Sequence, residues 1–253
     1  MSQHGVVYVI AAMAMAVAAL MGCDAMPGRP RPAEQPPMPS QVMGFAELYG
    51  RFCAGCHGTD GRLGAARPLN DPVYLALVPP DRLRMIIAEG VPGTAMPGFA
   101  SAAGGPLTEA QLDALIEEMH QRWSRPSPSP DAPLPPYTTE AKVTNDSLAG
   151  DPEQGLRVYA EACASCHGAD GTGGAKGGSV VDAAYLTLVS DQALRTAVIA
   201  GRTDLGMPDW RSYIPGQPLT SQQISDVVAW LASHRQPVLG RSRASVQVRR
   251  PEP

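Results

Sequence analysis

The chain repeats one order of segments twice along its 253 residues. CAGCHGTDG begins at Cys53 and CASCHGADG begins at Cys163, an offset of 110 residues. Three further pairs keep this order at offsets of 111 or 112, namely DPVYLALV with DAAYLTLV, AMPGF with GMPDW, and PLTEAQLDALI with PLTSQQISDVV. Four matched blocks with so little drift predict a duplicated domain, so both halves should share one architecture.

Each half has the pattern of a set of helices. FAELYGRFC precedes the first motif and GLRVYAEAC the second, with apolar residues spaced to lie on one helical face. Middle helices are expected over residues 81–90 and 191–201, each with Asp at its start and Gly at its end. Closing helices should follow the capping boxes Thr108 with Gln111 and Thr220 with Gln223. Because no alternating strand pattern competes, the sequence predicts an all-α fold.

Proline-rich stretches separate the parts that can fold. Gly and Pro contribute 26 residues each, and much of the Pro lies in residues 24–40 and 124–136, where it favours extended spacers. We expect a domain over residues 41–123, a Pro-rich linker over 124–144, a second domain over 145–236 and a basic tail over 237–253. Aromatic residues make up only 5% of the chain, so each small core should need a staple such as a covalent cofactor.

The N-terminal segment predicts export. Residues 6–20 are apolar but too few for a span of about 20 residues, which favours a signal peptide over residues 1–22. The ending LMGC resembles the lipobox of bacterial lipoproteins, in which the Cys becomes the lipidated first residue. This predicts lipidation of Cys23, a Pro-rich spacer over residues 23–40, and a place in the periplasm or at the outer face of the bacterial cytoplasmic membrane. An uncleaved anchor and a released, cleaved form are the alternatives.

The overall charge argues against a nucleic-acid partner. The formal net charge is −4, and both signs are mixed along the chain. A protein that binds nucleic acid would show a basic face or stripe.

Each half carries C-x-x-C-H, the spacing of c-type haem attachment. In a helical backbone, residues three apart point the same way, so Cys53 with Cys56, and Cys163 with Cys166, can present two sulfurs to one porphyrin. His57 or His167 would then be the proximal iron ligand, giving two haem c groups.

Two other uses of the CxxC pairs are weaker. A zinc site would need the pairs much closer than their separation of 110 residues. A thioredoxin-like redox pair would need a surrounding βαβ pattern, and neither half has one.

A methionine in each half is the candidate sixth ligand. Met96 lies 39 residues after His57, and Met207 lies 40 after His167; both precede a Pro and a closing helix. Each Met could instead simply fill core space, but its recurrence as Met-Pro at one repeat position favours ligation. His120 and His234, near the ends of the closing helices, are expected to be exposed.

The order of helix, CxxCH, Gly-rich loop, middle helix, Met-Pro and closing helix resembles a class I cytochrome c domain in both halves. This resemblance implies an all-α fold around a haem with a partly exposed edge. It also implies a close crossing of the first and last helices between a Gly and an aromatic residue. Gly155 and Trp230 fit that pattern, whereas Phe45 and Glu118 occupy the matching positions in the first half. As a pair, the halves resemble di-haem cytochromes and the cytochrome subunits of bacterial respiratory complexes.

With both irons saturated by protein ligands, no position would remain for a substrate. We therefore expect one-electron transfer, with redox proteins as partners and the lipid anchor holding the carrier near a membrane respiratory complex. The rival is a haem enzyme, such as a peroxidase or a substrate-oxidising cytochrome, in which Met96 or Met207 is displaced at one haem. A third reading, with the same chemistry, makes the chain the electron-accepting subunit of a dehydrogenase.

Overall fold

The computed structural model describes residues 36–125, 133–138 and 150–236. Residues 1–35, with the predicted signal peptide and Cys23, lie outside the described residues, as do parts of the linker and the predicted basic tail over 237–253. The chain divides into two compact units, Met1–Val42 and Met43–Pro253. In the first unit, the described residues form one short 3₁₀ turn, η2 (Pro39–Gln41). Within the described ranges, no helix is both long and apolar enough to cross a bilayer.

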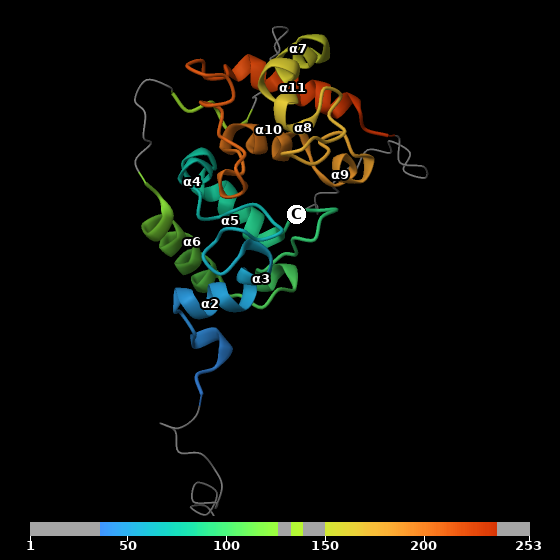
Figure 1. Ribbon diagram of the computed structural model, residues 1–253. Helices are drawn as coiled ribbons and strands as arrows, with labels where there is room; N and C mark the ends of the chain where they lie inside the picture. Colours follow the sequence, from blue (N-terminus) through green and yellow to red (C-terminus); the bar gives the residue numbers. More distant parts are fainter. Residues whose placement is uncertain (1–35, 126–132, 139–149, 237–253) are drawn as a thin grey trace, which may run out of the picture. The chain divides into compact units, whose positions relative to one another are not determined.

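The second unit contains two successive sets of helices (Figure 1). The first set is α2 (Phe45–Phe52), α3 (Ala54–His57), α4 (Pro72–Leu77), α5 (Pro80–Glu89), η3 (Ser101–Ala103) and α6 (Glu109–Trp123). The second set is α7 (Pro152–Ala162), α8 (Ala164–His167), α9 (Ala183–Leu188), α10 (Asp191–Ala200), η4 (Thr203–Leu205) and α11 (Ser221–Ser233). Only isolated bridges and no strand occur among the described residues. The all-α prediction is therefore confirmed for them.

Side-chain caps begin several of these helices. Both predicted capping boxes form, at Thr108 with Gln111 on α6 and at Thr220 with Gln223 on α11. The middle helices begin close to the predicted residues, but their N-caps are Pro79 and Ser190. The acidic residues assigned to their starts lie in the first turn instead, where a negative charge favours the helix dipole.

The first and last helices of the second half cross at a glycine, as the sequence suggests. A Cβ on Gly155 would lie 2.0 Å from the Asp226 carbonyl oxygen and 2.8 Å from the Trp230 Cβ. The Tyr159 and Trp230 rings lie 4.1 Å apart between their centroids. Only a residue without a side chain permits this approach.

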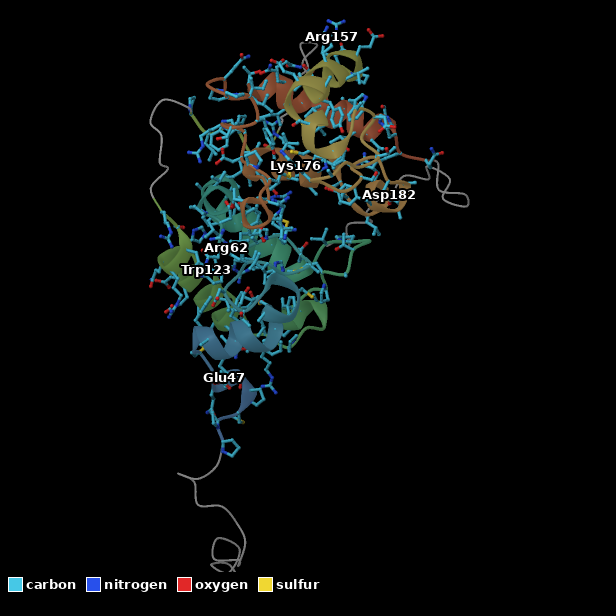
Figure 2. All side chains as sticks on the ribbon, in the orientation of Figure 1. Glu47, Arg62, Trp123, Arg157, Lys176 and Asp182 are labelled. Atoms are coloured by element: carbon cyan, nitrogen blue, oxygen red, sulfur yellow. The ribbon has the colours of Figure 1, made fainter. Side chains whose placement is uncertain are left out.

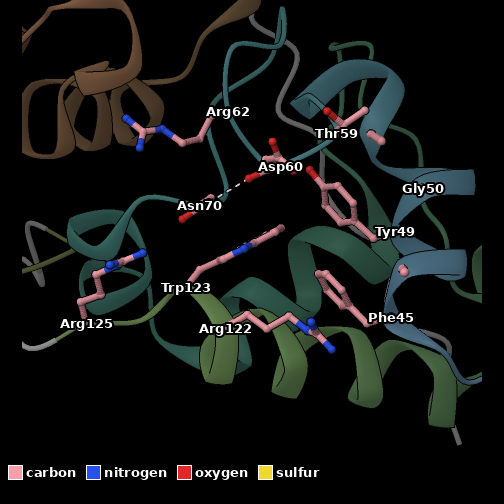
Figure 3. Close-up of a pocket in the computed structure, with 12 residues that line it drawn as sticks. Phe45, Tyr49, Gly50, Thr59, Asp60, Arg62, Asn70, Arg122, Trp123 and Arg125 are labelled. Atoms are coloured by element: carbon pink, nitrogen blue, oxygen red, sulfur yellow. Dashed lines mark hydrogen bonds between the residues drawn. The ribbon is translucent and has the colours of Figure 1, made fainter.

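In the first half, the aromatic residue of the crossing is Trp123 and not a residue at the Glu118 position. Its ring meets those of Phe45 and Tyr49 edge to face, at centroid distances of 5.4 and 5.2 Å (Figure 3). Gly61 faces the tip of the Trp123 ring as Gly171 faces that of Trp230. Glu118 forms an ion pair with Arg122 on the same helix. The first half thus fills the place of Trp230 from the last turn of α6.

Part of the predicted linker docks on the second half. The carbonyl oxygen of Pro136 accepts hydrogen bonds from Nε and Nη2 of Arg195 on α10, at 3.1 and 3.0 Å. The Tyr137 carbonyl accepts another from Gln192, at 2.7 Å. A buried guanidinium therefore holds the backbone of residues 133–138 on the second half.

Candidate functional site

The first CxxCH motif occupies a sharp break between two helices. α2 ends at Phe52, Cys53 is its C-cap, and the single turn α3 carries Cys56 and His57. The backbone N–H groups of Cys56 and His57 both donate to the Cys53 carbonyl, at 3.1 and 3.0 Å. One tight turn therefore holds both thiols and the imidazole.

His57 is buried and oriented through one ring nitrogen. Its Nδ1 lies 2.6 Å from the Arg67 carbonyl oxygen, and its Nε2 is buried without a partner. Burial lowers the pKa of His57, and the Arg67 carbonyl opposes that shift. The imidazole is thus neutral at physiological pH, the form that binds a metal.

The second motif repeats this arrangement. Cys163 is the C-cap of α7, and α8 carries Cys166 and His167. Nδ1 of His167 lies 2.8 Å from the Gly178 carbonyl oxygen. His167 is half-buried, so it is more accessible than His57.

A tyrosine closes the turn after each motif. The Tyr49 hydroxyl donates to the Gly58 carbonyl at 2.9 Å, and the Tyr159 hydroxyl donates to the Gly168 carbonyl at 2.6 Å. Gly58 has φ of +85°, and a Cβ there would lie 1.8 Å from the Arg62 carbonyl oxygen. The chain can therefore fold back beneath the histidine only because this position has no side chain.

The first thiol of each motif is protonated at neutral pH. Burial is the main cause that raises the pKa of Cys53 to about 11 and that of Cys163 to about 12. Redox-active CxxC pairs have a lowered thiol pKa instead. The electrostatics therefore disfavour a thioredoxin-like use of these cysteines.

The two candidate methionines occupy matching turns. The amide of Val91 donates to the Met96 carbonyl at 3.0 Å, and the amide of Arg202 donates to the Met207 carbonyl at 3.1 Å. Both methionines are half-buried. A glycine with positive φ begins each turn, and a Cβ on Gly90 or Gly201 would press on the backbone just after the methionine, at 2.5 or 2.2 Å. Both halves thus build one loop around their Met-Pro, although axial ligation stays a prediction.

A family model for cytochrome c oxidase, cbb3-type, subunit III matches residues 40–117 and 150–231, more than half of the chain. The chain belongs to this family. It is a c-type cytochrome with two tandem cytochrome c domains, and such domains imply covalently bound haem c. The family match covers both repeats and both CxxCH motifs.

Three relatives in known proteins are informative. The cbb3-type cytochrome c oxidase subunit FixP of Sinorhizobium medicae is 30% identical over 192 residues, 72% of this chain and 57% of that relative. FixP of Rhizobium meliloti is 30% identical over 177 residues, 67% of this chain and 54% of that relative. The dihydro-heme d1 dehydrogenase of Pseudomonas aeruginosa is 40% identical over 74 residues, 29% of this chain and 14% of that protein. The chain spans little more than half the length of the FixP relatives.

The residues of the first cytochrome c domain fit a haem. His57 has one nitrogen on a carbonyl and the other buried without a partner, which is the state of an imidazole ready to ligate iron. Nη1 of Arg67 is also buried without a partner. Buried polar groups are normally paired, so both atoms fit a group with an iron and carboxylates.

The pocket in Figure 3, of about 790 Å³, is separate from the predicted set of haem-binding residues. Its lining contains none of the predicted haem-binding residues. Phe45, Tyr49 and Trp123 form its apolar part, and Arg62, Arg122 and Arg125 contribute its cations.

The two remaining histidines are more buried than the sequence suggested. His120 and His234 are both half-buried, so the expectation that they are exposed is wrong. Nδ1 of His234 lies 2.8 Å from the Trp230 carbonyl, and its ring packs edge to face on Trp230. Nδ1 of His120 lies 3.1 Å from the Ser124 hydroxyl.

Sequence reasoning missed the groups that orient the two motif histidines. They are the carbonyls of Arg67 and Gly178, which follow the histidines by 10 and 11 residues. A carbonyl leaves no trace in residue type, and only the nearly equal offset in the two repeats could have pointed to it.

Proposed function

We propose that the protein transfers single electrons through two covalently bound c-type haems, as a carrier or as a subunit of a respiratory electron-transfer complex. The observation that carries this proposal is the state of His57, buried and neutral with Nε2 unpartnered and Nδ1 on a backbone carbonyl. His167 has the same backbone contact in the second repeat. The two FixP relatives are named as subunits of cbb3-type cytochrome c oxidases, and this supports the respiratory role.

In this proposal, Cys53 and Cys56 hold one porphyrin through thioether bonds, and Cys163 and Cys166 hold the other. When bound, haem c supplies an iron that exchanges one electron between Fe(III) and Fe(II). The chain's own residues fix its position. The short helices α3 and α8 carry the histidines, the carbonyls of Arg67 and Gly178 set the ring orientation, and Tyr49 and Tyr159 close the turn beneath.

Met96 and Met207 are proposed as the sixth ligands. The matched turns around them supply the argument, because both place a half-buried Met-Pro after a glycine that admits no side chain. A thioether is a soft ligand, so it favours Fe(II) and raises the reduction potential. Two saturated irons suit a carrier better than an enzyme.

We further propose that a lipid on Cys23 tethers the protein at the outer face of the cytoplasmic membrane. A tether would keep it close to a membrane oxidase or a quinol-oxidising complex. Purification from membranes in mild detergent, with mass spectrometry of the N-terminus and of co-purifying chains, tests this directly. A mature protein in the soluble fraction with an unmodified Cys23 would contradict the tether.

The haem assignment is tested on the mature protein from the periplasm. A pyridine haemochrome assay and intact mass should give two haems per chain. The weak far-red absorption band of His/Met haems should have the intensity of two sites, and Met96→Ala or Met207→Ala should each remove half of it.

Met43→Ala is the matched control, because Met43 is exposed and lies outside both turns. Its far-red band should equal that of the wild type. A wild-type band of half intensity would instead indicate one haem with a displaceable ligand and would favour a haem enzyme.

A further inference from the structure

The two halves of the second unit meet where the Met207 turn lies against the first domain. α10 packs against α4 (Figure 1), and three hydrogen bonds join residues more than 130 positions apart. The amide of Leu63 donates to Oδ2 of Asp204 at 3.0 Å, Nη2 of Arg202 donates to the Gly64 carbonyl at 3.2 Å, and the Thr203 hydroxyl donates to Oδ2 of Asp71 at 3.1 Å. We call residues 202–204 the latch.

The latch is tied to the turn that presents Met207. The amide of Arg202 donates to the Met207 carbonyl at 3.1 Å, and the Met207 amide donates to the Arg202 carbonyl at 3.0 Å. Any displacement of Arg202 therefore moves the backbone of Met207. The side chains of Arg202 and Asp204 also form an ion pair, and only 1% of the Asp204 side chain is exposed.

The repeat shows that this contact is a property of the second turn alone. Residues 91–93 occupy the matching place in the first half and read Val, Pro, Gly, so they lack the charged pair. The Thr94 hydroxyl donates within its own turn, to the Val91 carbonyl. The two turns share a backbone pattern, but only the second carries side chains that reach the other domain.

The receiving segment is also specialised. Leu63 has φ of +61°, the only positive φ outside glycine among the described residues. The second half has Gly173 at this repeat position, and the Gly173 amide donates inside its own domain, to the His167 carbonyl at 2.9 Å. A left-handed leucine is strained, and here that conformation turns the Leu63 amide outward to Asp204.

We infer that the latch makes the first domain a support for the sixth-ligand turn of the second, so that Met207 stays on the second iron only while the domains are docked. Arg202, Thr203 and Asp204 are then positioning residues, which act on the second haem through the backbone of the Met207 turn. This inference rests on the proposed ligation by Met207. The inference makes the reduction potential of the second haem, and the stability of its methionine ligand, depend on docking of the first domain.

The test uses the full-length holoprotein with Asp204→Asn, Thr203→Val and the charge-changing control Arg157→Gln. Arg157 lies on α7 (Figure 2). Its side chain donates a hydrogen bond to Gln154 of the same helix. Two readouts are taken. Hydrogen–deuterium exchange at the Leu63 amide measures the docking of the two domains. The pH at which each ferric far-red band disappears, as the pH is raised, measures how firmly the sulfur ligand is held.

Asp204→Asn should speed exchange at the Leu63 amide. It should also raise about tenfold the fraction of the second haem that has lost its methionine ligand, which is the effect expected for loss of a hydrogen bond to a charged group. That is a fall of about one unit in the pH midpoint, because tenfold equals one pH unit. Thr203→Val should act in the same direction by a smaller factor, since it removes the single hydrogen bond that the Thr203 hydroxyl makes to Asp71 among the described residues. The pH midpoint of the first haem should equal the wild-type value in both variants. The Arg157→Gln protein should match the wild type in both readouts.

Two results would overturn the inference. The first is a pH midpoint of the second haem that equals the wild-type value in both Asp204→Asn and Thr203→Val. The second is an altered midpoint in Asp204→Asn with unchanged Leu63 exchange and no effect of Thr203→Val, because the Arg202–Asp204 pair would then act only within its turn. If Met207→Ala leaves the far-red band intact while Asp204→Asn still speeds Leu63 exchange, the domains dock as described and the ligand assignment itself is wrong.

Discussion

Backbone carbonyls, and not side chains, orient the histidines of both CxxCH motifs. The Arg67 and Gly178 carbonyls face Nδ1 of His57 and His167 at 2.6 and 2.8 Å. A hydrogen bond from Nδ1 fixes the tautomer and the rotation of an imidazole ligand. Substitution at these two positions need not break the contact, whereas a change that moves the ring or the loop should.

Gly177→Ala and Gly178→Ala form a matched pair that tests this. A Cβ on Gly177 would lie 2.7 Å from both Cε1 and Nδ1 of His167, while a Cβ on Gly178 would meet nothing within 4 Å. We expect Gly177→Ala to destabilise the holoprotein by about 1–3 kcal/mol, the range for overpacking, and to lower occupancy of the second haem. Thermal unfolding and haem content per chain measure both effects. Equal behaviour of the two variants would contradict the assigned orientation of His167.

The site residues differ in how well the sequence could predict them. CxxCH is a local pattern, and one helical turn suffices to bring Cys53, Cys56 and His57 together. The partner carbonyls come from a Gly-rich loop, where the conformation depends on φ values such as the +85° of Gly58 rather than on residue type. The latch was missed for another reason, since Leu63 and Asp204 lie 141 positions apart.

At the scale of elements, the crossing of α7 and α11 sets the frame of the second domain. The α7 backbone at Gly155 approaches the Asp226 carbonyl so closely that a Cβ would lie 2.0 Å from it. Gly155→Ala should therefore separate the helices and part Tyr159 from Trp230, at a cost of about 3 kcal/mol in the free energy of unfolding. Denaturant titration of the holoprotein measures this loss.

Gly50→Ala is the control on the equivalent first helix of the other domain. A Cβ on Gly50 would meet nothing within 4 Å, and the residue is exposed. Ala is the better helix former, so this variant should gain about 0.5–1 kcal/mol. A loss of stability in Gly50→Ala, or none in Gly155→Ala, would contradict the packing described.

Element boundaries followed from local signals, whereas helix contacts did not. Thr108 and Thr220 predict the starts of α6 and α11 because the capping box is a short-range pattern. Trp123 was missed because the alignment of those boxes points to Glu118. α6 has 15 residues and α11 has 13, and the longer helix brings its aromatic residue to the crossing from the last turn.

At the scale of the whole molecule, Arg195 fastens residues 133–138 to the second domain. Arg195 is only 3% exposed, and burial lowers its pKa. Its guanidinium donates to the Pro136 carbonyl and to the hydroxyls of Ser221 and Ser225. Arg195→Met should cost about 2 kcal/mol because these buried acceptors lose their donor.

Arg157→Met is the control for that substitution, because Arg157 is exposed on α7. It should stay within about 0.5 kcal/mol of the wild type, as most surface changes do. Denaturant midpoints of the two holoproteins provide the comparison. A larger loss in Arg157→Met than in Arg195→Met would contradict the anchoring role.

Acid should weaken the contact between the latch and the first domain. The pKa of Asp204 is lowered, chiefly by hydrogen bonds from Arg202, with the Leu63 amide adding to the effect. A carboxyl with a lowered pKa stabilises the folded contact above its ordinary value of about 3.9, and that stabilisation is lost as the pH falls through the lowered value. Exchange at the Leu63 amide, corrected for its intrinsic rate, should therefore be constant from pH 7 to about pH 4 and rise below it.

The charged groups that face Asp204 make the assignment testable. Arg202 forms an ion pair with Asp204, and Asp71 of the first domain accepts a hydrogen bond from Thr203. In Asp204→Asn, which has no carboxyl to titrate, exchange at Leu63 should already be fast at pH 7 and should lack the acid rise. An equal acid rise in that variant would contradict the assignment of the effect to Asp204. Because Arg202 ties the latch to the Met207 backbone, the wild-type far-red band of the second haem should weaken in the same acid range, while that of the first haem should not follow it.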